Sequence, residues 1–193
     1  MKELKLNKRS EESGHSAKRL RKNGIIPGIV YGKKLGSLMF EIGQMELLKD
    51  LKDIGEHGVV NFNLDGYNGT AVIKELQKDA VYHNVIHLDL EEIDVNNKIE
   101  SEVPIVFTGK NFLNDKGIVL QTQKDTVKVS CKPEDLPKVI EFDVKNAPIG
   151  SVFKLSDIEV ASEVSIVDNL NTVLASICGK QLIIEPKDDI EKK

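Results

Sequence analysis

Residues 14–32, GHSAKRLRKNGIIPGIVYG, join a short basic helix to the start of an apolar strand. Leu20 is spaced to face inward from a helix over residues 17–22, which leaves its charged neighbours outside. Gly24 stands where helices commonly end, and Pro27 cannot continue one. The stretch therefore predicts a helix, a stop and a following strand.

Short apolar segments on either side of this stretch have the length and composition of strands, and those at residues 4–6 and 85–90 alternate apolar and polar residues, as strands with one buried face do. They are residues 4–6, 29–31, 38–42, 59–64, 70–74 and 85–90, with a helical pattern over 44–52 that sets Leu47, Leu48 and Leu51 on one side. Asp65-Gly66 and Asn68-Gly69 are turn dipeptides that favour a hairpin between the strands around them. Residues 1–94 are therefore predicted to form an α+β domain built on a barrel-like sheet with short helices.

The second half of the chain has a different residue pattern, in which no long amphipathic helix is evident. Apolar residues alternate on single faces near residues 99–107, 127–131, 140–144 and 173–177. Prolines such as Pro104 punctuate these runs. We expect a mainly β C-terminal domain over residues 95–185 and a polar tail over 186–193.

Composition agrees with a folded protein of this kind. The chain has 193 residues, of which 40% are hydrophobic and 30% charged. Its two cysteines are too few for a disulfide framework. No apolar run reaches the roughly 20 residues of a membrane span, and the N-terminus lacks a secretory pattern. A cytoplasmic protein is expected.

Charge is distributed unevenly along the chain. The net charge is −4, yet residues 1–34 hold ten Lys and Arg against three Glu. All three Arg residues of the chain, Arg9, Arg19 and Arg21, lie in that segment. Since the planar guanidinium suits phosphate oxygens and guanine edges, this distribution favours an anionic partner at the N-terminal domain.

Sequence motifs for catalysis are missing from the pattern. No phosphate-binding glycine loop, nucleophile elbow or His-Glu-x-x-His motif occurs. His83 and His87 are four residues apart, but on an extended segment they would stand about 13 Å from each other, too far for one metal ion. We therefore expect a non-enzymatic protein with no metal and no cofactor.

The stretch from Arg9 to Gly32 resembles the N-terminal signature of a bacterial ribosomal protein family that binds 5S rRNA. That signature reads x-R-x-L-R-x-x-G-x-x-P-[AG]-x-x-Y-G and is followed further along by a Gln and a His-x-Asp. The matching residues are Arg19, Arg21, Gly24, Pro27, Tyr31, Gly32, Gln77, His87 and Asp89. His15 and Ala80 replace a frequent Lys and a frequent Pro. A β-rich segment after Asp94 makes the chain similar to the long form, the general stress protein CTC family.

The resemblance implies a structural protein of the large ribosomal subunit that binds the loop E region of 5S rRNA. The residues expected to contact RNA are Arg9, Lys18, Arg19, Arg21, Lys22, Tyr31, Lys33, Gln77, His87 and Asp89. The Lys and Arg side chains would bind phosphates. Tyr31 would stack or donate a hydrogen bond from its hydroxyl, and Gln77 would form hydrogen bonds with base edges or ribose. His87 would donate a hydrogen bond to a phosphate or a 2′-hydroxyl. Asp89 would orient His87 or a basic side chain, or accept a hydrogen bond from a 2′-hydroxyl or a base amino group of the RNA.

The expected partners are 5S rRNA, the large subunit and neighbouring ribosomal proteins, with the free protein a monomer in the cytoplasm. Two alternatives stay open from the residues alone. One is a protein-interaction module whose basic helix docks an acidic protein. The other is an enzyme whose site is assembled from residues far apart in the sequence.

Overall fold

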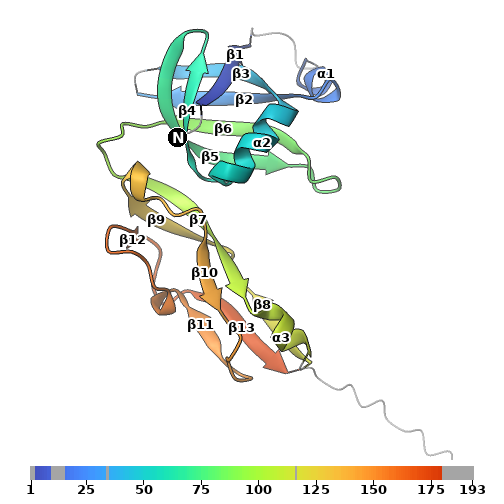
Figure 1. Cartoon of the computed structure of the whole chain (residues 1–193), viewed down its shortest axis with the longest axis vertical. Coiled ribbons are helices and arrows are strands. Elements are labelled where there is room, and N and C mark those ends of the chain that lie inside the picture. Colours follow the sequence, from blue (N-terminus) through green and yellow to red (C-terminus); the bar gives the residue numbers. More distant parts are fainter. Residues whose placement is uncertain (1–2, 10–15, 34, 116, 180–193) are drawn as a thin grey trace, which may run out of the picture.

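The computed structural model of the chain describes residues 3–9, 16–33, 35–115 and 117–179. A closed β-barrel is followed by two small sheets (Figure 1). The elements of the barrel part are β1 (Glu3–Lys8), α1 (Ser16–Lys22), β2 (Ile25–Gly32), β3 (Gly36–Gly43), α2 (Gln44–Ile54), β4 (Val59–Leu64), β5 (Tyr67–Lys78) and β6 (Val85–Glu92). Those of the second part are β7 (Ile99–Thr108), α3 (Lys110–Asp115), β8 (Ile118–Thr122), β9 (Thr126–Cys131), β10 (Ile140–Asp143), β11 (Val152–Lys154), β12 (Ser165–Ile166) and β13 (Val173–Gly179), with 3-10 turns at Pro133–Asp135 and Leu155–Asp157.

The barrel closes in the strand order β1-β3-β2-β6-β5-β4. Alternate residues of each strand point inside, as Val60, Phe62 and Leu64 of β4 show by their burial. The pairs β1–β4 and β2–β6 are parallel, whereas the other neighbours are antiparallel. Because the apolar residues fill the interior, the outer face of the barrel is free to carry polar side chains.

Two glycines let the strands approach the phenylalanine rings in the barrel core. A Cβ atom at Gly28 would lie 2.4 Å from the Phe40 ring, and one at Gly69 would lie 2.7 Å from the Phe62 ring. Gly69 is paired with Phe62 inside β5, so the prediction that Asn68-Gly69 forms a turn is wrong. The turn between β4 and β5 is at Asp65-Gly66, with positive φ angles of 49° and 91°.

The two helices of the barrel part follow the prediction with small differences. α1 begins at Ser16, one residue earlier than expected, and Gly24 follows it with a φ of +72°, as the predicted stop requires. In α2 Leu47 is fully buried in the barrel core, but Leu48 is 37% exposed. Adjacent helical residues differ by about 100°, so both could not face the core equally.

The second part has its own apolar core between two sheets. Their strand orders are β10-β7-β9-β12 and β11-β13-β8. The predicted alternation in β7 and β9 is confirmed by burial of every second residue. Pro104 lies inside β7, where the ladder with β9 ends at Pro104 and the ladder with β10 begins at Ile105. The missing N–H is tolerated there because Pro104 is at the end of the β9 ladder.

The predicted fold class is confirmed: an α+β barrel part with short helices precedes a mainly β part. Among the residues described, no helix combines the length and apolar character that crossing a bilayer requires. His15 and the predicted tail over 186–193 lie outside the described residues.

Candidate nucleic-acid interface

Helix α1 carries exposed cations beside the barrel. Lys18, Arg19, Arg21 and Lys22 are all exposed. Three of these cations lie in the last helical turn, where the partial negative charge of the helix C-terminus stabilises them. The short sequence between two strands thus concentrates positive charge at one place on the surface.

A side chain of α1 ties this helix to the sheet. Arg21 Nε donates a hydrogen bond to the Ile86 carbonyl oxygen of β6 at 2.8 Å. Behind the helix, Gln44 N donates to Gly24 O at 2.8 Å. Because Ile86 directly precedes His87, α1 lies next to the predicted RNA-contacting end of β6. Arg21 Nε is used inside the protein, so a phosphate contact by this residue would use its terminal nitrogens.

Gln77, His87 and Asp89 lie together on the outer face of β5 and β6. The strand register pairs Gln77 with His87 and Glu75 with Asp89. His87 Nδ1 is 2.6 Å from Asp89 Oδ1, and the two side chains are 29% and 24% exposed. Gln77 Nε2 donates to Glu75 Oε1 at 3.0 Å. Asp89 is therefore positioned to fix the orientation of the His87 ring.

Tyr31 and Lys33 lie at the end of β2 that is remote from α1. The eight residues of β2 extend over about 23 Å. Tyr31 is paired with Glu91 on β6. Burial raises the pKa of Tyr31, and the negative charge of Glu91 raises it further. The phenol therefore stays protonated at neutral pH and can donate a hydrogen bond. Lys33 is exposed in the turn after β2.

Arg9 approaches the same surface from β1. Its backbone N–H donates to Met39 O at 3.0 Å. Met39 is paired with Ile29, and Ile29 is paired with Asp89. Three strand spacings therefore separate the Arg9 and Asp89 backbones, at most about 14 Å. A long Arg side chain can cover part of that distance.

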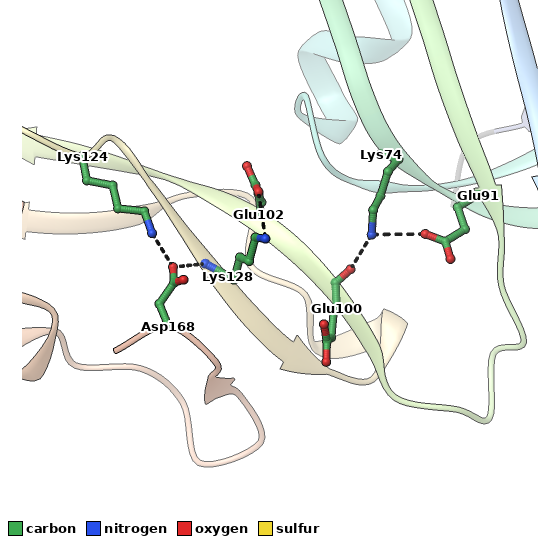
Figure 2. A network of polar contacts seen from close by, with 7 residues as sticks. All are labelled: Lys74, Glu91, Glu100, Glu102, Lys124, Lys128 and Asp168. Carbon is green, nitrogen blue, oxygen red and sulfur yellow. Dashed lines mark hydrogen bonds and ion pairs between the residues drawn. The ribbon is translucent and has the colours of Figure 1, made fainter. Parts of the chain in front are cut away.

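Sequence reasoning missed three charged residues around this face, Lys74, Glu75 and Glu91. The register shifts between Ile73 and Glu75, a β-bulge that exposes both Lys74 and Glu75. Lys74 Nζ lies 3.2 Å from Glu91 Oε2 and 3.4 Å from the carbonyl oxygen of Glu100 on β7 (Figure 2). Period-two alternation could have found the two acids, but the bulge and the link to β7 leave no mark in the sequence.

The two halves of this surface suit different parts of a nucleic acid. α1 offers cations that attract phosphates. The sheet face places Gln77, His87 and Tyr31 among carboxylates, which repel phosphates and accept hydrogen bonds from hydroxyl or amino groups. The structure thus brings the α1 residues close to Gln77, His87 and Asp89, whereas Tyr31 and Lys33 lie toward the opposite end of β2.

Comparison with known proteins shows two matched families along the chain. Residues 4–90 match the Ribosomal L25p family, and residues 98–181 match the C-terminal domain of ribosomal protein TL5. The chain is 39% identical over 184 residues to the large ribosomal subunit protein bL25 of Clostridium perfringens, covering 95% of this chain and 91% of the relative. It is 34% identical over 190 residues to that of Caldicellulosiruptor saccharolyticus, covering 98% and 94%. It is 30% identical over 190 residues to the large ribosomal subunit protein bL25 of Bacillus pumilus, covering 98% of this chain and 91% of the relative.

Proposed function

Because the chain belongs to the Ribosomal L25p family, in the long form with a TL5-type C-terminal domain, we propose that residues 1–94 bind 5S rRNA within the large ribosomal subunit. The protein is a structural component and not an enzyme. The proposal rests above all on one observation: the Arg21–Ile86 hydrogen bond holds the basic helix beside the Gln77–His87 pair.

The helix and the sheet face have separate roles in this proposal. Lys18, Arg19 and Lys22 bind phosphates through charge-assisted hydrogen bonds, with Arg9 and Lys33 extending the contact. Gln77 and Tyr31 bond base edges or riboses in a groove. The cations supply affinity that is independent of sequence, while the polar residues of the sheet supply selectivity.

The contact with Asp89 fixes what His87 can offer to RNA. If the proton on His87 Nδ1 is donated to Asp89 at 2.6 Å, the neutral ring has no second N–H. Its Nε2 then accepts a hydrogen bond, which a ribose 2′-hydroxyl can donate and a phosphate cannot. A phosphate contact through Nε2 would require the imidazolium. The 2′-hydroxyl is therefore the better partner for neutral His87, and it also distinguishes RNA from DNA.

Carboxylates on the sheet face argue for a groove contact rather than a backbone contact. Glu75, Asp89 and Glu91 would repel phosphates placed directly over them. The exocyclic amino groups of bases and the 2′-hydroxyls in a shallow RNA minor groove can donate hydrogen bonds to these oxygens. An internal loop with non-Watson-Crick pairs, such as loop E, offers such groups in an accessible groove.

We assign residues 95–185 a role outside phosphate binding. Residues 95–185 hold ten Lys and no Arg against thirteen Asp and Glu, a net charge of −3. A β domain with this charge and without Arg is poorly suited to RNA phosphates and better suited to contact with neighbouring ribosomal proteins.

A filter-binding titration of the full chain tests the proposal. It compares 5S rRNA with an unrelated RNA of equal length at the same salt concentration. We expect clearly tighter binding to 5S rRNA. Equal affinity for both RNAs, or none for either, would favour the alternative in which the basic helix docks an acidic protein.

A further inference from the structure

Residues 79–84 connect β5 to β6 and form the tip of this hairpin, where two neighbouring apolar side chains are exposed to solvent. Val81 is 74% exposed and Tyr82 is 78% exposed. Both lie outside the cluster of buried residues that forms the barrel core. A single exposed apolar residue is common, but a large aromatic ring beside a β-branched residue at a projecting tip is a surface suited to contact.

This tip is held in one conformation by its own hydrogen bonds. Asp79 Oδ1 accepts from Val81 N at 2.9 Å and from Tyr82 N at 2.8 Å. These two bonds lower the pKa of Asp79, so its carboxylate is ionised at neutral pH. His83 has a left-handed φ of 55°, and its N–H donates to Asp79 O at 2.9 Å. The aromatic ring is thus presented from an ordered backbone, which reduces the entropy lost on binding.

The tip continues the proposed RNA-binding surface. Gln77 and His87 are paired at its base, and Arg21 bonds to Ile86 between that base and α1. Figure 1 shows the tip on the same side of the barrel as α1. Asp79 is the only acid between residues 76 and 87, and its carboxylate is already used by the N–H groups of the tip. The tip therefore lacks the outward carboxylates of the adjoining sheet face.

We propose that Tyr82 is a stacking platform for an unpaired base of the bound RNA. Proteins recognise internal loops and bulges by stacking their splayed bases on aromatic rings, and any of the four bases presents a suitable face. Val81 adds apolar contact at the edge of the stacked pair. The inference rests on the proposed function and adds a contact that neither the basic helix nor the polar sheet face supplies.

The test uses the full chain with 5S rRNA and two substitutions of Tyr82. Tyr82→Ala removes the ring, and we expect about 5- to 100-fold weaker binding with an unchanged dependence on salt. Tyr82→Trp keeps a stacking ring and should bind about as well as the parent. Since the chain contains no Trp, this variant also carries a unique fluorophore, whose emission should fall when a base stacks on it. Phe112→Trp, at an exposed position of α3 in the second part, is the matched control and should report no change.

The outcomes separate this inference from the proposed function. If the parent and Tyr82→Ala bind 5S rRNA equally, or if the Tyr82→Trp emission does not respond to bound RNA, the stacking proposal is wrong although RNA binding stands. Normal RNA binding by Tyr82→Ala with poor incorporation into large subunits would also overturn it, in favour of a protein contact at the tip. Failure of the parent to bind 5S rRNA would remove both proposals.

Discussion

Salt dependence of RNA binding tests how many cations of α1 contact phosphates. Lys18, Arg19, Arg21 and Lys22 are exposed on this helix. At about 0.7 to 0.9 per contact, four contacts give a slope of roughly −3 in a plot of log affinity against log salt. Raising salt from 50 to 200 mM should then weaken binding about 60-fold. Arg19→Ala should reduce the magnitude of the slope by about 0.7 to 0.9 and weaken binding by about 1–3 kcal/mol.

The assay is a series of filter-binding titrations of the full chain against 5S rRNA at several salt concentrations. Lys132→Ala is the matched control, because it removes an exposed cation from the second part of the chain. It should leave both the affinity and the slope unchanged. A parental slope near zero, or an equal effect of Lys132→Ala and Arg19→Ala, would refute the reasoning that α1 neutralises phosphates.

Three further predictions concern selectivity, packing and acid stability. Gln77→Ala and His87→Ala should each reduce the preference of the full chain for 5S rRNA over an unrelated duplex, while the slope of log affinity against log salt stays constant. An unchanged preference in both variants would place selectivity in the helix alone. Gly28→Ala should destabilise the barrel by about 3 kcal/mol in urea unfolding, because its Cβ would meet the Phe40 ring and a backbone oxygen at 2.4 and 2.5 Å, and an unfolding midpoint equal to that of the parent would contradict this packing. Burial raises the pKa of Asp168, but hydrogen bonds from the Lys124 side chain and the Lys128 backbone outweigh it and leave the pKa lowered (Figure 2). The stability of this contact is therefore present above about pH 4 and lost as pH falls through the lowered pKa, so the difference in melting temperature between the parent and Asp168→Asn should shrink from pH 7 to pH 3.

Local physical chemistry explains why much of the fold could be predicted from the sequence. Strand segments such as β4 and β9 show period-two alternation because one face of each is buried. The end of α1 could be placed because only a residue such as Gly24 adopts a φ of +72° at little cost. The misplaced turn at Asn68-Gly69 has an equally physical cause. Gly69 is needed for the close approach of the Phe62 ring, a tertiary contact that the sequence pattern does not encode.

The candidate site was predictable only in part for a similar reason. The outer-face positions of His87 and Asp89 follow from alternation along β6, and the register then brings Gln77 opposite His87. The Arg21–Ile86 bond and the Lys74 bulge depend on contacts between segments distant in the chain. Neither one leaves a local signal, so the exact balance of cations and carboxylates on this surface required the structure.

Hydrogen exchange of the full chain, measured with and without 5S rRNA, tests the location of the interface most directly. We expect slower exchange on RNA binding in α1 and in the hairpin of β5 and β6, which carry Arg19, Gln77 and His87. Exchange in β8 and β9 of the second part should change little. Protection confined to the second part, with α1 and the hairpin unchanged, would contradict an RNA interface on the barrel part.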